Sequence, residues 1–421
     1  MSVTILKGNI ISAPALGALE ITERGYLVAA DDVIEGVYQT LPAEYQNLPV
    51  EDFGDALILQ SFADLHLHGP QYPMLGMGMD LPLMQWLDAY TFPMEAKFQD
   101  TAFARKIYHQ LAQELAENGT TRVCMFSSLH REATLVLMEE LENAGLCGYV
   151  GKVNMDRSGS DVLQETTEES VSETLLWLEQ CGKFKNVHPI ITPRFTPACS
   201  PELLKKLGRI AAEYDLPIQS HLSENCEEIA LVSSLYPECQ GYWETYAGNG
   251  LWNSRTLMAH CVWSDAGERQ AMKDAGVTVV HCPDSNQNVM SGVAPVRMML
   301  QEGLNVALGT DIAGGDHISM FDAAASAIRA SKARRILDAW QTDFLTVAEG
   351  WYLATSAGAE FFGEKPGFAP GNALHAIVLS DDALPDTDLT VPERFERCVY
   401  RRQKDAIRAV YSNGKKIYTA V

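Results

Sequence analysis

Short apolar runs alternate with longer stretches of helical spacing through the middle of the chain. The runs have the length of buried strands, whereas the longer stretches repeat apolar residues every three or four positions. Strands that alternate with helices predict an α/β protein. The eight predicted strands are Leu57–Asp64, Arg122–Ser127, Gly148–Asn154, Val187–Thr192, Pro217–His221, Thr256–His260, Val277–His281 and Asn305–Gly309.

Two of the stretches between these strands also carry boundary signals of helices. Ser200 precedes the predicted helix Pro201–Tyr214, and serine is a favoured N-cap with proline tolerated in the first turn. The predicted helix Thr101–Asn118 is followed by Gly119, a residue type that commonly ends helices.

Eight strands that alternate with helices fit a (β/α)8 barrel. A doubly wound sheet would alternate in the same way, but no Gly-x-Gly-x-x-Gly sequence opens a helix after the first strand. Residues with candidate chemistry are also spread over several strand ends, which favours the barrel. Residues 1–56 and 366–421 instead read as short strands and turns, so the predicted barrel covers residues 57–365.

The composition narrows the classes of function. A net charge of −23 opposes binding to nucleic acid, because phosphate backbones are also negative. No stretch approaches the roughly 18 consecutive apolar residues of a membrane span, and the first residues do not resemble a signal peptide. Nine cysteines without a Cys-x-x-Cys pair are typical of reduced thiols, so a cytoplasmic protein is expected.

The strongest chemical signal is the sequence Asp-Leu-His-Leu-His that ends in His66 and His68. Side chains alternate along a strand, so the two imidazoles point to the same face, roughly 6.5 Å apart along the strand. They can turn toward one metal ion, or they can be two histidines of an exposed strand. This motif alone leaves both interpretations open.

Three other predicted strands end in residues that bind metals. His221 and His260 each end a strand, and Asp311 follows the strand that begins at Asn305. A single histidine at a strand end is more often a hydrogen-bonded structural residue. Their recurrence at several strand ends of one predicted barrel favours a site for zinc or iron(II), which bind imidazole and carboxylate ligands.

Glu224 lies three residues after His221, where a turn would leave its carboxylate near such an ion. Glutamate beside a metal can move protons between water and a leaving group. The alternative is a glutamate at a helix start that only complements the helix dipole. The chain lacks His-Glu-x-x-His, the phosphate-binding loop, Gly-x-Ser-x-Gly and the cytidine-deaminase zinc signature, so any hydrolysis uses another scaffold.

This pattern resembles the amidohydrolase superfamily, whose deaminases with one metal carry His-x-His after the first strand and further ligands after later strands. The predicted fourth strand holds no lysine that would bridge two metals. Within the superfamily the chain is similar to the guanine deaminases over nearly its whole length. The matching stretches are HLHGPQ, LPLMQWLDAYTFPMEAKFQD, ENGTTRV, GKVNMDR, ITPRF, QSHLSEN, MAHC, HCPDSN and LGTDIAGG.

The resemblance implies a role for each candidate residue and a reaction. One divalent metal, expected to be Zn²⁺ with Fe²⁺ as the alternative, would be held by His66, His68, His221 and Asp311. Glu224 would carry protons, His260 would stabilise the oxyanion, and Asp311 would also help protonate the departing amine. The purine would contact Gln71, Arg194 and Phe195. The expected reaction is hydrolytic deamination of guanine to xanthine and ammonia.

The resemblance also implies an architecture and an assembly. The two chain ends would form a small β-sandwich of residues 1–56 and 366–421, and the protein would be a homodimer. The insertion Gly69–Gln99 would close over the purine, or alternatively pack in a subunit interface. A second reading of the function is deamination of a pterin, 8-oxoguanine or a triazine, and a third is an inactive scaffold barrel.

Three positions depart from the family pattern. Gln60-Ser61 stands where Pro-Gly usually enters the first strand, and His375 stands where the small domain usually has aspartate. Neither change removes a ligand. Asp284 replaces the usual asparagine or threonine after His-Cys-Pro, and its place near the predicted active site puts the substrate in question.

Overall fold

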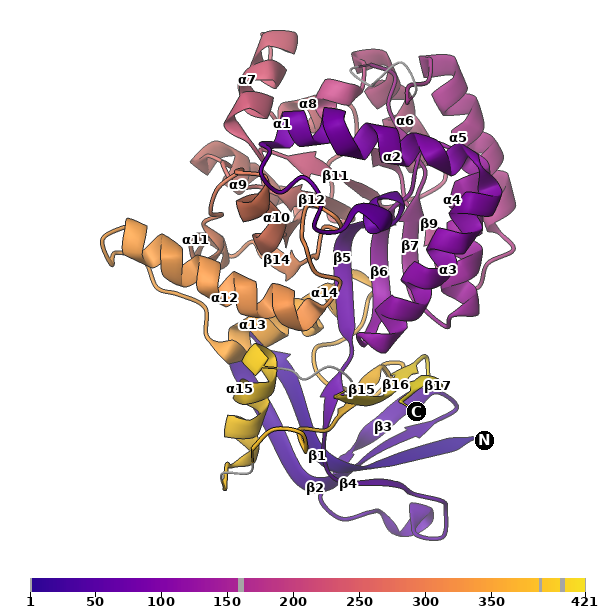
Figure 1. Ribbon diagram of the computed structural model, residues 1–421, viewed down its shortest axis with the longest axis vertical. Helices are drawn as coiled ribbons and strands as arrows, with labels where there is room; N and C mark the ends of the chain where they lie inside the picture. The colour runs from indigo at the N-terminus through magenta and orange to yellow at the C-terminus, as the bar shows by residue number, and fades with distance from the viewer. Residues whose placement is uncertain (1, 158–162, 386–387, 402–405, 421) are drawn as a thin grey trace.

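The computed structural model describes residues 2–157, 163–385, 388–401 and 406–420, and these form two parts (Figure 1). In the strand–helix part, two four-stranded parallel sheets are covered by helices. In the terminal sheet, strands from both chain ends form one seven-stranded sheet. Among the described helices, none combines the length and apolar character needed to cross a membrane.

The two parallel sheets have the strand orders β5-β6-β7-β9 and β11-β12-β13-β14. On one side, the N–H of Gln219 donates to the carbonyl of Ile191 at 2.9 Å. On the other side, the N–H of Asp311 donates to the carbonyl of His66 at 2.8 Å. Hydrogen bonds therefore link the two sheets along both sides. The strands of the two sheets are β5 Phe62–His68, β6 Thr120–Phe126, β7 Cys147–Gly151, β9 Val187–Pro189, β11 Ile218–Leu222, β12 Thr256–His260, β13 Thr278–His281 and β14 Asn305–Leu308. A separate two-stranded sheet pairs β8 Val153–Asn154 with β10 Thr192–Pro193.

Helices follow most of these strands, and both helices with boundary signals are confirmed. The Ser200 hydroxyl accepts the N–H of Leu203 at 3.1 Å, which caps α6. Gly119 has a φ of 81°, a conformation that glycine adopts without the strain of a Cβ. The longer helices are α3 Thr101–Glu117, α4 Arg131–Asn143, α5 Thr167–Cys181, α6 Pro201–Glu213, α7 Cys226–Leu235, α9 Ala266–Ala275, α11 Val296–Glu302, α12 Met320–Leu337, α13 Val347–Ala354, α14 Ser356–Phe361 and α15 Val391–Arg401.

The predicted strand Leu57–Asp64 is wrong as one element, because it is divided between the two parts of the molecule. Residues up to Gln60 belong to the terminal sheet, and β5 begins at Phe62. Between them the N–H of Ser61 donates to the carbonyl of His375 at 3.3 Å. Both flanks are buried, so the hydrophobic pattern carries no sign of the change of sheet.

The terminal sheet has the strand order β17-β16-β15-β4-β1-β2-β3. Side chains from strands far apart in this order, such as Leu27, Ala376 and Tyr411, belong to one buried apolar cluster. The predicted domain limits, 1–56 with 366–421 and 57–365, stay a prediction, and β4 extends four residues past the first of them. The strands are β1 Val3–Ala15, β2 Ala18–Ala30, β3 Val33–Tyr38, β4 Glu51–Gln60, β15 Ala376–Leu379, β16 Ile407–Ser412 and β17 Lys415–Thr419.

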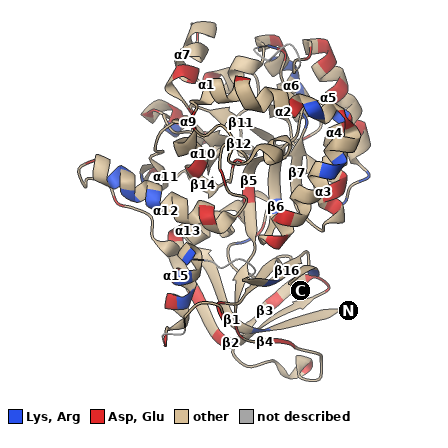
Figure 2. Cartoon of the chain, in the orientation of Figure 1, with Lys and Arg blue, Asp and Glu red and all other residues tan. Residues whose placement is uncertain are grey.

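The C-terminal region also contains a helix that the sequence pattern did not predict. Helix α15 packs on α12, and the Phe395 ring meets the Trp351 ring edge-on with centroids 5.1 Å apart. Charged residues lie mainly on the outer helices and on the terminal sheet, while the central strands carry few (Figure 2). Few Lys, Arg, Asp or Glu residues are therefore placed on the central strands.

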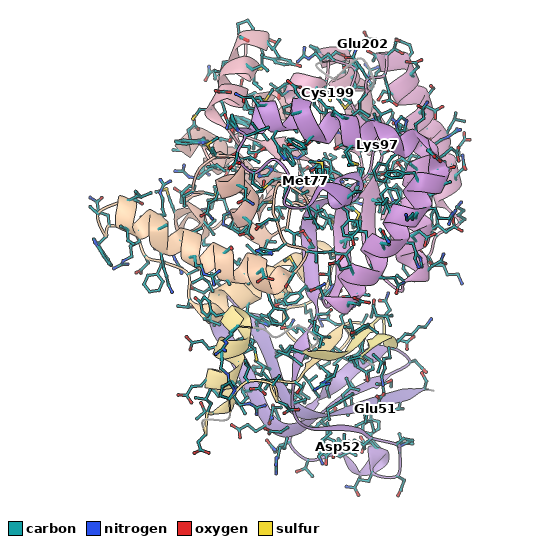
Figure 3. The ribbon with its side chains drawn as sticks, viewed as in Figure 1. Glu51, Asp52, Met77, Lys97, Cys199 and Glu202 are labelled. Carbon is teal, nitrogen blue, oxygen red and sulfur yellow. The ribbon has the colours of Figure 1, made fainter. Side chains whose placement is uncertain are left out.

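The insertion Gly69–Gln99 crosses the strand–helix part above the ends of the parallel strands (Figure 1). It consists of short turns of helix, and Figure 3 shows its residues Met77 and Lys97 far from Glu51 and Asp52 of the terminal sheet. Its elements are η2 Gly69–Met74, α1 Leu83–Trp86, η3 Leu87–Thr91, α2 Phe92–Ala96 and η4 Lys97–Gln99. This position places the insertion beside the chemistry of the strand ends.

Candidate metal-dependent active site

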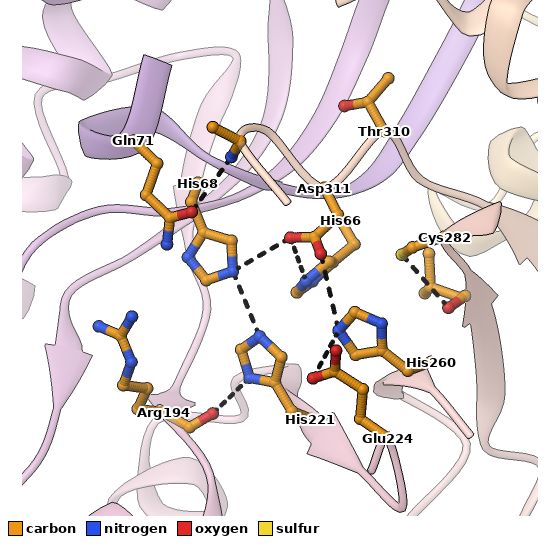
Figure 4. A network of polar contacts seen from close by, with 12 residues as sticks. His66, His68, Gln71, Arg194, His221, Glu224, His260, Cys282, Thr310 and Asp311 are labelled. Atoms are coloured by element: carbon orange, nitrogen blue, oxygen red, sulfur yellow. Dashed lines mark hydrogen bonds and ion pairs between the residues drawn. The ribbon is translucent and has the colours of Figure 1, made fainter. Parts of the chain in front are cut away.

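Four residues from three separate parts of the chain meet at the ends of the parallel strands (Figure 4). The candidate ligand atoms of His66, His68 and His221 lie within 4.8 Å of one another, and so do those of His66, His260 and Asp311. The Nε2 atoms of His68 and His221 are 3.2 Å apart. Asp311 Oδ1 lies 3.2 Å from His66 Nε2 and 3.5 Å from His68 Nε2. We call His66, His68, His221 and Asp311 the metal-ligand cluster.

The chemistry of this cluster fits a cation. His66 Nε2 is buried and makes no hydrogen bond within the described part of the chain, although it faces Asp311. His221 Nδ1 lies 2.5 Å from the carbonyl oxygen of Arg194. A carbonyl only accepts, so Nδ1 carries the proton and the Nε2 lone pair faces the cluster. Buried lone pairs that converge in this way are suited to a metal ion.

The protonation states agree with this interpretation. Burial lowers the pKa of His66, and it lowers the pKa values of His68 and His221 well below the usual value. These imidazoles are therefore neutral at pH 7. Burial alone would raise the pKa of Asp311, but His66 and the other nearby histidines outweigh it and hold that pKa well below its usual range. The cluster thus combines neutral nitrogen ligands with one carboxylate.

Glu224 and His260 adjoin the cluster. Glu224 Oε2 lies 3.5 Å from His260 Nε2, and Glu224 Oε1 accepts the Ser291 hydroxyl at 2.9 Å. The N-terminus of α7 is capped by Asn225 with Glu228, so Glu224 is not needed to complement that helix. Its carboxylate faces His260 instead.

The pKa values of Glu224 and His260 are both raised. Burial raises the pKa of Glu224. Burial opposes the charge of His260, yet the Glu224 and Asp311 carboxylates raise its pKa above the usual value. His260 Nδ1 lies 2.9 Å from Asn286 Oδ1, an acceptor that fixes the orientation of the ring. Each group therefore holds a proton more readily in this site than it would in water.

The predicted substrate residues lie on the opposite side of the same cavity. Gln71, Arg194 and Phe195 line this cavity together with His68, His221, Glu224, His260 and Asp311. Insertion residues Leu83, Trp86 and Leu87 also line the cavity and give it an apolar wall, and Ser285 adds a further polar group. A flat, partly polar ring matches such a site.

Arg194 forms a buried ion pair that the sequence did not indicate. Its Nη1 and Nη2 donate to Glu95 Oε2 and Oε1 at 2.5 and 2.9 Å. Arg194 therefore both forms a salt bridge and lines the cavity. Glu95 lies 99 positions away in the insertion, and a single glutamate in a short helix carries no sequence signal of this pairing. Ser291 and Asn286 were also missed, because each bonds to a residue that is distant in the sequence.

The three departures from the family pattern lie outside the cavity lining. Asp284 Oδ1 accepts the Ser326 hydroxyl at 2.5 Å, toward α12. Ser61 Oγ lies 2.6 Å from Thr121 Oγ1, and His375 Nδ1 lies 3.1 Å from that same oxygen. Ser61 and His375 therefore join the two parts of the molecule, and Asp284 supports a helix.

A buried histidine–aspartate cluster with an adjacent acid and base at strand ends defines the class of metal-dependent hydrolases. Comparison with known proteins agrees. The model of the amidohydrolase family matches residues 57–417, and the chain belongs to this family.

Individual proteins are similar over nearly the whole chain. Guanine deaminase from Dictyostelium discoideum is 33% identical over 99% of this chain and 98% of its own length. Guanine deaminase from Mus musculus is 35% identical, over 89% of this chain and 85% of its own. The crystal structure of guanine deaminase from C. acetobutylicum, with guanine bound in the active site, is 41% identical with a TM-score of 0.97 over 99% of this chain and 100% of that one.

Proposed function

We propose that this chain catalyses the hydrolytic deamination of guanine to xanthine and ammonia. The observation that carries the proposal is the meeting, at one cavity, of the metal-ligand cluster, the Glu224–His260 pair and the donors of Arg194 and Gln71. The similarity to guanine deaminases, including a structure with bound guanine, supports the choice of substrate.

His66, His68, His221 and Asp311 would hold one divalent ion, which supplies Lewis-acid activation of the attacking water. Glu224 takes a proton from that water and delivers it to the ring nitrogen next to the amino-bearing carbon. The new C–O bond forms on this carbon. Ser291 holds the other carboxylate oxygen of Glu224, so the free oxygen stays directed at the reaction.

His260 and Asp311 complete the reaction. His260 donates from Nε2 to the oxygen that gains negative charge, while Asn286 restrains its other nitrogen. Asp311 lines the same cavity, with Oδ2 3.8 Å from His260 Nε2, and passes the second proton of water to the amine. The C–N bond then breaks, and ammonia and xanthine leave.

The finer features of the fold and assembly belong to the same proposal. Hydrogen bonds at both sides of the two parallel sheets support a closed (β/α)8 barrel. The shared apolar cluster of distant strands supports a folded-over terminal sheet, that is, a small β-sandwich. Nitrogen-rich ligation supports Zn²⁺ over harder cations. The homodimer and the cytoplasmic location stay predictions.

The test is an ultraviolet assay of guanine conversion by purified protein, before and after treatment with a chelator. We expect xanthine formation that chelator abolishes and added Zn²⁺ restores. A parallel assay of ammonia release from pterin, 8-oxoguanine and triazine substrates distinguishes the alternative deaminases. Ammonia release from one of these but not from guanine would replace the proposed substrate, and no turnover by metal-loaded protein would favour a scaffold.

A further inference from the structure

Glu95, a buried glutamate of the insertion, makes three hydrogen bonds within the described part of the chain, all with Arg194 and Gln71. We call Gln71, Arg194 and Phe195, the residues proposed to contact the purine, the purine-binding wall. Glu95 is 1% exposed and does not line the cavity. Its two oxygens accept from the two ends of the Arg194 guanidinium, and Oε1 also accepts from Gln71 Nε2 at 3.0 Å. One carboxylate therefore fixes both polar side chains that are proposed to contact the purine.

The same contacts decide which atoms face the cavity. Gln71 Oε1 accepts the backbone N–H of Ala313 at 3.1 Å, which occupies one of its two lone pairs and holds that oxygen toward the backbone. Gln71 Nε2 keeps one N–H after donating to Glu95, and Arg194 keeps three of its five. The wall that Glu95 organises thus offers mainly hydrogen-bond donors.

A second residue of the same helix restrains the guanidinium from another side. The Arg194 guanidinium carbon lies 5.1 Å from the centre of the Phe92 ring, and Phe92 precedes Glu95 by three positions in α2. Residues three apart share one face of a helix. A single turn of the insertion therefore supplies both an aromatic face and a carboxylate for Arg194.

We infer that Glu95 is a positioning residue that sets specificity for an oxo group on the purine. This inference rests on the proposed function. With the amino-bearing carbon at the metal-ligand cluster, the opposite edge of guanine carries O6 and N7, which are both acceptors. A guanidinium fork matches that edge well. A wall made mainly of donors disfavours an amino group at the same position, because two donors would face each other.

The test compares guanine with 2,6-diaminopurine, in which an amino group replaces the 6-oxo group. In Glu95→Gln one carboxylate oxygen becomes an amide NH2, so an acceptor for Arg194 or Gln71 is replaced by a donor that faces another donor. We expect KM for guanine to rise about 10- to 100-fold with kcat within about fivefold of wild type, as for loss of a charge-assisted hydrogen bond. The preference for guanine over 2,6-diaminopurine, as a ratio of kcat/KM, should fall at least about tenfold.

Glu114→Gln is the matched control. Glu114 lies on α3 and accepts the hydroxyl of Tyr72, so it also joins the insertion to the rest of the molecule. It contacts neither Arg194 nor Gln71 among the described hydrogen bonds. This variant should change neither the guanine KM nor the preference by more than about twofold, since the hydrogen bond between Glu114 and Tyr72 lies outside the cavity lining.

Each outcome decides the inference. If folded Glu95→Gln keeps the wild-type KM and preference, or if Glu114→Gln shifts them equally, Glu95 has no specific positioning role. If Glu95→Gln does not fold, as judged by circular dichroism, Glu95→Asp replaces it, because the shorter carboxylate cannot hold both partners in place. An unchanged KM in that variant also overturns the inference. Wild-type protein that never converts guanine overturns the proposed function and this inference together.

Discussion

The metal-ligand cluster and the purine-binding wall lie on opposite sides of one cavity but are built in different ways. The cluster residues lie at the ends of strands, where neighbouring backbones fix their positions. The wall residue Arg194 is held in place by Glu95 and Phe92, and Glu95 also holds Gln71. Gln71, Glu95 and Phe92 all belong to the insertion, a region of short helical turns. Regular backbone thus positions the residues proposed to carry out the chemistry. Side-chain contacts with a loop-rich segment position the residues proposed to recognise the purine.

The largest expected effect comes from removing a ligand on the strand side. Asp311→Asn should lower kcat by about 10⁴-fold or more, because it removes both a metal ligand and a proton carrier. Metal analysis of the purified variant should show reduced occupancy. Asp284→Asn is the control, since Asp284 is a half-buried carboxylate that bonds to Ser326 outside the cavity lining. Equal losses in both variants would mean that general packing accounts for the effect.

Loss of the proton carrier should have the next largest effect and should leave the metal in place. Glu224→Gln keeps the hydrogen bond from Ser291 but cannot take up a proton, so kcat should fall about 10²- to 10⁴-fold. Metal content and KM should stay near wild type. Glu227→Gln, at an exposed position in the same helix region, should remain active. A Glu224→Gln enzyme with more than a tenth of wild-type kcat would argue against the shuttle.

The recognition side should respond mainly in KM. Arg194→Ala would leave Glu95 buried without its cation, a change that destabilises proteins by about 3–5 kcal/mol. Arg194→Lys keeps the charge and loses the fork, so it isolates the geometry. We expect KM for guanine to rise about 10-fold or more, with metal content unchanged because the backbone carbonyl still orients His221. Lost metal in Arg194→Lys would show that the two sides are not separable.

The smallest expected effect concerns Glu228, a buried carboxylate that accepts the backbone N–H of Glu224. Burial next to Glu224 raises the pKa of Glu228 to about 7 in the folded protein, above the usual 4.5. A raised folded pKa contributes stability that is complete below pH 4.5 and is lost as pH rises through 7. Glu228→Gln removes this titration, so its melting temperature relative to wild type should increase by a few degrees from pH 5 to pH 8. A constant difference across that range would contradict the raised pKa.

The same difference between the two sides of the cavity explains which site residues could be predicted from the sequence. His66, His68, His221 and Asp311 were predicted because metal-binding residue types recur where apolar runs end, and the structure brings them together. The Glu95–Arg194 pair could not be predicted, since 99 residues separate its members and neither follows a periodic pattern. The change of sheet at Ser61 was hidden for a different reason: both neighbouring strands are buried, so their apolar runs merge.

Residue 194 has two separate tasks, one for its backbone carbonyl and one for its side chain. The carbonyl fixes the proton on His221 whatever side chain is present, since every amino acid supplies the same oxygen. Libraries that vary positions 71, 95 and 194 together could therefore seek enzymes for other heterocycles while the reaction centre keeps its tautomer. Position 95 belongs in such a library, because a new side chain at 194 would otherwise leave a buried carboxylate without a counter-ion.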